Sequence, residues 1–214
     1  MAEYKLELRG VCKSFPGVKA LDNVQLSLRP GTVHALMGEN GAGKSTLMKC
    51  LFGIYKMDAG EIILDGEKVE INNPDEAMKK GIAMVYQEMS IFPELTVAQN
   101  IFINQEERAG RKATIHEKGL IDEAVALSEK YGIEIDPYAT AGDLPIASQQ
   151  MIEILKALSY DPDILILDEP TNGLDPSGIH EIRNLIKSLP ALYDCTVLIS
   201  SHMLSEIELM ADDI

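Results

Sequence analysis

The sequence has few cations, few cysteines and no long apolar run, and each shortage argues against a class of function. Lys and Arg total 19 against 34 Asp and Glu, so the formal net charge is −15. That balance opposes binding to a nucleic-acid backbone, because such affinity rests on clustered cations. No apolar run approaches the ~20 residues of a membrane span. The start, MAEYKLELRG, contains an acid and lacks the apolar core of a secretory signal.

The three cysteines, Cys12, Cys50 and Cys195, are odd in number and far apart. This usage predicts buried thiols in a reducing compartment rather than a disulfide framework or a zinc site. The 214 residues are 46% hydrophobic and 25% charged, which is typical of a soluble globular protein of one good-sized domain or two small ones. We therefore expect an acidic cytoplasmic protein.

Hydrophobic periodicity predicts alternating strands and helices. The expected strands cover residues 4–8, 24–28, 32–37, 82–87, 163–168 and 195–201, with a hairpin over 60–71 that turns at Asp65-Gly66. The expected helices cover residues 44–53, 74–81, a segment beginning at Pro176, and a last one through Met210. Such alternation indicates an α/β fold with a mostly parallel sheet.

Residues 88–159 differ in character, because strand patterns vanish there. An amphipathic helix is expected over 114–131, with a capping box at Thr114 and Glu117 and a stop at Gly132. We interpret 88–159 as a helical subdomain inserted into an α/β core made of 1–87 and 160–214.

The segment GENGAGKST, residues 38–46, fits the pattern G-x-x-x-x-G-K-[ST] at every fixed position. It follows an expected strand and opens an expected helix, which is the context that the pattern requires. Its glycines allow backbone N–H groups to turn toward an anion, Lys44 supplies charge to the β- and γ-phosphates, and the Ser45 hydroxyl can ligate Mg²⁺. The candidate nucleotide-binding residues are Gly38, Asn40, Gly41, Ala42, Gly43, Lys44, Ser45 and Thr46. We expect a nucleoside triphosphate with Mg²⁺.

A second motif is the apolar strand ILIL followed by Asp168 and Glu169. A strand end of this kind places Asp168 beside the phosphate loop, where it can hold Mg²⁺ through water. A hydrolase also needs a base or an acceptor that orients the attacking water, and Glu169 has the right chemistry and position for that role.

Together these motifs resemble the ATP-binding cassette, the nucleotide-binding domain of ABC transporters, over essentially the whole chain. Gln87 ends the strand IAMVYQ where this family has its Q-loop, and TNGLD, residues 171–175, resembles the D-loop with Asp175 as its acid. His202 follows VLISS where the family has its switch histidine, and Phe15 lies where an aromatic residue stacks on adenine.

The resemblance implies a fold and a set of roles. The fold is a P-loop NTPase with a RecA-like, mostly parallel sheet, an antiparallel β subdomain and an inserted helical subdomain. The cofactors are ATP and Mg²⁺. The expected catalytic residues are Lys44, Gln87, Glu169 and His202. The residues expected to bind the metal are Ser45, Gln87 and Asp168. Glu169 polarises water, His202 contacts the γ-phosphate, and Gln87 senses both Mg²⁺ and the transport subunit.

The same resemblance implies a head-to-tail pair of cassettes, each closing the partner's site with a segment that is typically Leu-Ser-Gly-Gly-Gln. Here that segment reads LPIAS, residues 144–148. Pro145 offers neither the hydroxyl nor the N–H of the usual serine, and Ala147 adds a methyl group where glycine is favoured. Pro145 suits the first turn of the following helix. The expected residues at the interface with the second cassette are Pro145, Ala147, Ser148 and Asp175.

Within the family, residues 38–62 and 85–103 resemble the first cassette of bacterial sugar importers, whereas 171–214 looks closer to antibiotic and peptide exporters. We therefore hypothesise a seam near residues 159–172. The family normally continues with further strands, which would begin near Ile214, so we expect these C-terminal strands of the family to be missing here.

The leading interpretation is an ATP-hydrolysing subunit, or N-terminal half, of a transporter that drives carbohydrate import. Its expected partners are a second cassette and an integral membrane permease, which would place the chain on the cytoplasmic face of the membrane without a span of its own. Two alternatives stay open: a soluble ABC ATPase acting on ribosomes or DNA, and a hydrolytically weak regulatory cassette.

Overall fold

The structure, a computed structural model, describes residues 3–103, 105 and 117–213. The strands are β1 (Leu6–Phe15), β2 (Val18–Leu28), β3 (Val33–Met37), β4 (Ala59–Leu64), β5 (Glu67–Val69), β6 (Ile82–Val85), β7 (Ile164–Asp168) and β8 (Thr196–Ser201). The helices are α1 (Lys44–Leu51), α2 (Pro74–Lys79), α3 (Val97–Ile101), α4 (Glu117–Tyr131), α5 (Ile146–Leu158), α6 (Pro176–Tyr193), α7 (Leu204–Ile207) and the 3₁₀ turn η1 (Ala141–Asp143).

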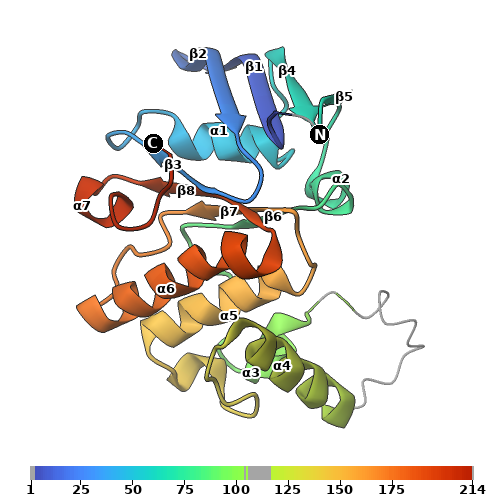
Figure 1. The fold of residues 1–214 in the computed structure, drawn as a ribbon, viewed down its shortest axis with the longest axis vertical. Coiled ribbons are helices and arrows are strands. Elements are labelled where there is room, and N and C mark those ends of the chain that lie inside the picture. The colour runs from blue at the N-terminus through green and yellow to red at the C-terminus, as the bar shows by residue number, and fades with distance from the viewer. Residues whose placement is uncertain (1–2, 104, 106–116, 214) are drawn as a thin grey trace.

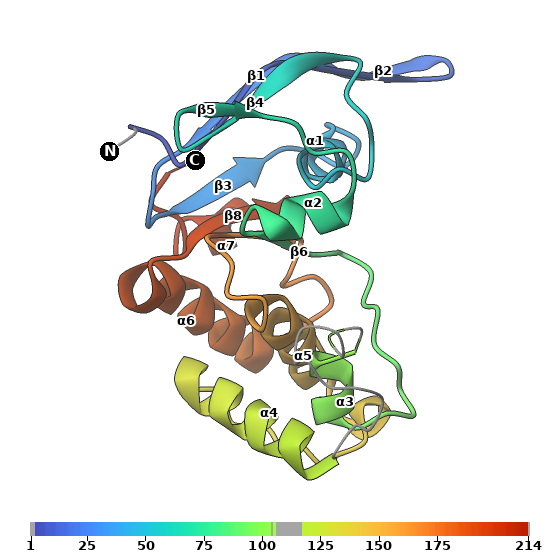
Figure 2. The same ribbon diagram turned by 90° about the vertical axis from the view of Figure 1, so that its right-hand side faces the viewer.

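Two sheets and several helices form layers (Figures 1 and 2). An antiparallel sheet has the order β2-β1-β4-β5, and a parallel sheet has the order β3-β8-β7-β6. Helix α1 lies between the two sheets, while α5 and α6 cover the other face of the parallel sheet, with α3 and α4 beyond them. This arrangement confirms the α/β fold class expected from the sequence.

Strand β7 is apolar at four successive positions because both faces of the parallel sheet are buried. Ile164 and Ile166 belong to the cluster shared with α1 and the antiparallel sheet. Leu165 and Leu167 belong to the cluster shared with α5 and α6. Because both faces of the parallel sheet are covered, successive side chains on either face must be apolar, and all four are fully buried.

Among its described residues, the stretch 88–159 contains α3, α4, η1 and α5 joined by loops, and no named strand. Gly132 follows the end of α4 with φ +65°, a conformation suited to glycine at a helix end. The apolar face of α5, including Ile152, Ile154 and Leu155, joins the same core cluster as the parallel sheet. The division at residues 88 and 159 stays a prediction. Thr114 of the expected capping box lies outside the described residues, as does Ile214.

Several local expectations need correction. The first hairpin is longer than the alternation in 4–8 and 24–28 indicates: β1 and β2 run to a two-residue turn at Pro16-Gly17. Proline fixes φ near −65° and Gly17 adopts φ +80°, so this pair forms a tight turn that periodicity alone does not reveal. The last helix ends at Ile207 rather than Met210. By contrast, the turn at Asp65-Gly66 is confirmed, with positive φ at both residues.

Candidate functional site

The candidate site lies at one edge of the parallel sheet. Because β3, β8, β7 and β6 are parallel, their carboxyl ends meet there. The phosphate loop follows β3, Glu169 follows β7, and His202 follows β8. Gln87 comes two residues after the end of β6. Residues far apart in the sequence thus follow the carboxyl ends of the strands at the same edge of the sheet. This edge is the usual place for ligands in open α/β sheets.

The phosphate loop spans residues 38–43 and leads directly into α1. Gly41 and Gly43 adopt φ values of +85° and +93°, which favour glycine. A Cβ on Gly43 would also lie 2.7 Å from the carbonyl oxygen of Ala20, so the loop is held closely against β2. The turn is closed by the N–H of Ala42, which donates to the carbonyl of Glu39 at 3.1 Å. Asn40, Gly41 and Ala42 are exposed at its tip.

Lys44 and Ser45 open α1, and Thr46 follows them half-buried. Lys44 is only 7% exposed, and its Nζ donates to the carbonyls of Gly38 at 2.6 Å and Glu39 at 3.2 Å. The same Nζ lies 3.7 Å from Oε1 of Glu169. The ammonium group is therefore held over the loop, beside the start of α1, and the first N–H groups of a helix have no partner within the helix itself.

Ser45 and Asp168 form the oxygen pair expected of a Mg²⁺ site. The Ser45 hydroxyl donates to Oδ1 of Asp168 at 3.1 Å, and the Asp168 residue is 2% exposed. Mg²⁺ is usually held by one or two carboxylate or hydroxyl ligands together with phosphate oxygens and water. The described residues contain no group of three or more His, Cys, Asp or Glu side chains able to hold a metal. The Ser45–Asp168 pair fits Mg²⁺ only as part of a nucleotide complex.

Glu169 has a left-handed backbone, with φ +52°. This conformation is unfavourable for a residue with a side chain, and such strain clusters at functional sites. Here it turns the carboxylate toward Lys44 and His202: Nδ1 of His202 lies 2.6 Å from Oε2 of Glu169. The Glu169 side chain is 8% exposed, whereas that of His202 is 41% exposed. The two side chains therefore share one short hydrogen bond, in which the role of Nδ1 depends on the tautomer of the imidazole ring.

Phe15 and Gln87 lie at the margins. Phe15 ends β1 with 37% exposure, and its ring meets that of Tyr55 edge to face with centroids 5.2 Å apart. The ammonium of Lys13 is 5.4 Å from the Phe15 centroid. Gln87 is exposed on the chain that leaves β6. The contacts of the site therefore unite Lys44, Ser45, Asp168, Glu169 and His202 and leave Phe15 and Gln87 apart from them. The roles of all these residues stay predictions.

The segment LPIAS leads into α5. Pro145 is the N-cap residue, one position before the first turn where proline was expected, and it provides no side-chain cap. Ala147 lies against α6, since a Cβ on Gly178 would come within 2.6 Å of the Ala147 Cβ. The methyl group of Ala147 therefore packs against its own chain. Asp175 caps α6 by accepting from the N–H of Gly178 at 3.1 Å.

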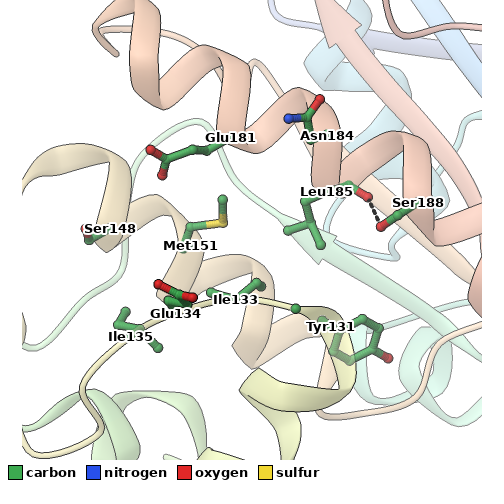
Figure 3. Close-up of a pocket in the computed structure, with 11 residues that line it drawn as sticks. Tyr131, Ile133, Glu134, Ile135, Ser148, Met151, Glu181, Asn184, Leu185 and Ser188 are labelled. Carbon is green, nitrogen blue, oxygen red and sulfur yellow. Dashed lines mark hydrogen bonds between the residues drawn. The ribbon is translucent and has the colours of Figure 1, made fainter.

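Ser148 lines a cavity of about 550 Å³ between α5, α6 and the chain that follows α4 (Figure 3). Met151 and Leu185 contribute apolar surface, and Glu134 and Glu181 contribute carboxylates. This cavity does not include any residue of the phosphate loop. The start of α5 is thus bordered by α6 on one side and by this cavity on another.

Ser200 is a residue of the site that the sequence motifs do not predict. It is fully buried at the end of β8, opposite Asp168 in the strand register. Its hydroxyl donates to Oδ1 of Asp168 at 2.6 Å and accepts from the N–H of Glu169 at 3.0 Å. The signal available in the sequence was a pair of serines closing an otherwise apolar strand, but only the pairing of β7 with β8 shows which serine meets Asp168.

Comparison with known proteins decides the family. The family model described as "ABC transporter" matches residues 21–172, more than half of the chain. The chain belongs to this family. Among solved structures, a nucleotide-free ATP-binding cassette from an ABC transporter superposes with a TM-score of 0.85 at 28% identity, covering 98% of this chain and 85% of that one. A cassette in its ADP conformation superposes with a TM-score of 0.85, also at 28% identity, over 99% of this chain and 86% of that one.

Curated relatives are sugar-import proteins by name. A putative ribose/galactose/methyl galactoside import ATP-binding protein from Halalkalibacterium halodurans is 47% identical over 99% of this chain. The galactose/methyl galactoside import ATP-binding protein MglA of Salmonella typhimurium is 43% identical over 99% of this chain. The chain spans only 40% and 41% of these two relatives. The alignments run through residues 159–172, so relatives of one kind align on both sides of the hypothesised seam. None of the helices among the described residues is long and apolar enough to cross a membrane.

Proposed function

We propose that this ABC-family chain binds ATP with Mg²⁺ and hydrolyses it to drive carbohydrate import. The observation that carries the proposal is the cluster of Lys44, Ser45, Asp168, Glu169 and His202 beside a glycine-rich helix start. The positive φ values of Gly41 and Gly43, together with the helix N-terminus, fit a bound phosphate chain.

In this proposal the phosphate loop accounts for nucleotide binding. Backbone N–H groups of residues 38–46 and the ammonium of Lys44 neutralise the β- and γ-phosphates, and Phe15 stacks on the base. Ser45 and Asp168 would hold Mg²⁺, which would neutralise part of the negative charge of the nucleotide. Because the Lys44 Nζ is bonded to loop carbonyls, binding of phosphate exchanges those contacts for stronger ones to an anion.

Hydrolysis assigns a role to each remaining residue. Glu169 accepts a hydrogen bond from the attacking water and orients it, and His202 bridges Glu169 and the γ-phosphate from the neighbouring strand. Gln87 reports the occupancy of the site through the chain that leaves β6. The burial of the Glu169 side chain, which is 8% exposed, supports this role, because a base shielded from bulk water acts on a single bound water.

Two cassettes act head to tail in this proposal, with LPIAS and Asp175 at the interface. An integral membrane permease anchors the pair to the cytoplasmic face of the membrane. The sugar-import names of relatives at 43–47% identity support carbohydrate import over an ATPase acting on ribosomes or DNA.

The test begins with nucleotide binding by calorimetry on the full chain. Unaltered chain should bind Mg-ATP, and Lys44→Met should weaken binding about tenfold or more, the usual effect of losing a hydrogen bond to a charged group. Lys187→Met, on the exposed face of α6, is the matched control and should bind normally. Co-purification with a permease encoded nearby then tests transport. Equal affinity in all three chains would contradict the proposed site.

A further inference from the structure

We infer that Ser200 is a positioning residue that sets the metal ligand Asp168 and the water-orienting Glu169 with a single hydroxyl. The inference rests on the proposed Mg-ATP site. Ser200 belongs neither to the phosphate loop nor to the acidic strand end, and it touches both residues of that strand end.

The strand register explains the contact. Along β7, Ile164 and Ile166 face the layer that contains α1, and Asp168 is the next residue in that alternation. Along β8, Leu198 faces the same layer, and Ser200 is next. Since Asp168 and Ser200 are paired in the parallel register, their side chains meet under the start of α1, where Ser45 lies.

The hydroxyl has two directed contacts. It donates at 2.6 Å to Oδ1 of Asp168, the same oxygen that accepts from Ser45 at 3.1 Å. Both donors contact Oδ1, so among the described residues these side-chain hydrogen bonds leave Oδ2 available toward a metal. These two hydrogen bonds fix the orientation of the Asp168 carboxylate. Hydrogen-bonding partners of metal ligands generally have this effect.

The second contact holds the backbone of Glu169. Its N–H points at the Ser200 hydroxyl at 3.0 Å and at the Ser200 carbonyl at 3.2 Å. Glu169 has φ +52°, a strained conformation that persists only when its surroundings enforce it. The same serine thus stabilises the turn that aims the Glu169 carboxylate at Lys44 and His202.

Comparing a threonine variant with a valine variant at position 200 measures the effect of the hydroxyl separately from that of side-chain volume. Ser200→Thr and Ser200→Val add the same branched bulk, but only threonine keeps the donor and acceptor. Ser200→Ala removes the hydroxyl without adding volume. Ser201→Ala is the control, because the Ser201 hydroxyl accepts from the N–H of Met203 and belongs to the opposite face of the strand.

The primary readout is metal binding rather than turnover. Mn²⁺ replaces Mg²⁺ as the probe, and free Mn²⁺ is measured by electron paramagnetic resonance during titration of each chain in the presence of ADP. We expect Ser200→Val and Ser200→Ala to bind Mn²⁺ about tenfold more weakly or worse, in the range found for partners of metal ligands. Ser200→Thr and Ser201→Ala should resemble the unaltered chain. ADP affinity in EDTA should be equal in all of them.

Equal Mn²⁺ affinity in the Thr and Val variants would overturn the inference. A loss of ADP affinity in EDTA as large as the loss of Mn²⁺ affinity would also overturn it. Such a loss would mean that Ser200 supports the whole nucleotide site rather than the metal ligand. If the Thr and Val variants fail to fold, the Ala variant is compared with the unaltered chain instead. Equal Mn²⁺ affinity in those two chains would then overturn the inference. An unaltered chain that binds no ADP, with or without metal, would instead refute the proposed function itself.

Discussion

The Nδ1 atom of His202 lies 2.6 Å from Oε2 of Glu169, and the opposite carboxylate oxygen lies 3.7 Å from the ammonium of Lys44. One acid thus connects β8 to the phosphate loop. Because Glu169 is held from both sides, its carboxylate is oriented before any nucleotide arrives, and such preorganisation costs no rearrangement during reaction.

Glu169→Gln should abolish most turnover while sparing nucleotide binding. The substitution keeps shape but removes the charge that orients water, which typically costs about 10²–10⁴-fold in rate. Phosphate-release kinetics and calorimetry with ATP measure the two effects separately. A tenfold loss of ATP affinity without loss of turnover would contradict this role. Glu129→Gln, exposed on α4, is the control.

Pro145→Ser should raise turnover in a cassette dimer by about tenfold, the value of one hydrogen bond to a charged group. ATP affinity of the monomer should stay nearly unchanged, since Pro145 is the N-cap residue of α5, whereas the phosphate loop of its own chain leads into α1. Pro145→Ala restores the N–H without the hydroxyl and is the matched control. Equal turnover in proline and serine chains, with dimerisation confirmed, would show that the proline is a neutral helix start.

Glu153→Ala should destabilise the fold. Glu153 is only 6% exposed on α5, and it accepts from the Ser90 hydroxyl at 3.1 Å and lies 3.6 Å from the Lys156 ammonium. Its loss removes the acceptor of the Ser90 hydroxyl and the charge beside Lys156, whose ammonium still donates to the Ser90 oxygen at 3.2 Å. Because Ser90 is exposed and can bond to water, the expected cost is about 0.5–1.5 kcal/mol in the free energy of unfolding. Urea denaturation measures this cost. A cost no larger than that of Glu129→Ala would contradict the structural role of the network.

The stability of the chain should fall at alkaline pH through Cys195. Burial disfavours the thiolate and raises the pKa of Cys195 to about 12, from an ordinary value of 9.0. Below pH 9 both states keep the proton, so the contribution is intact; above it the unfolded state releases its proton first, and stability is lost up to about pH 12. The slope is at most about 1.4 kcal/mol per pH unit. Cys195→Ala should make the decline in urea-derived stability less steep between pH 9 and 10.5, and the remaining slope includes Cys50, whose burial raises its pKa to about 11. Identical curves for the two chains would refute the effect.

The sequence by itself determined the α/β class, the phosphate loop and the acidic end of β7, because each is a local pattern whose chemistry depends on neighbouring residues. The hairpin at Asp65-Gly66 and the stop at Gly132 followed from backbone preferences in the same way. The tight turn at Pro16-Gly17 was just as local, yet the short alternating runs on either side concealed how far its strands extend.

Only the tertiary structure decided which residues complete the site. Ser200 rather than Ser201 meets Asp168, because the register of β7 against β8 selects one face of the strand. Likewise the methyl group of Ala147 turns out to pack on Gly178, a contact between two helices separated by β7. Such contacts join segments some thirty residues apart, and their geometry depends on packing across the whole core, which no local pattern encodes.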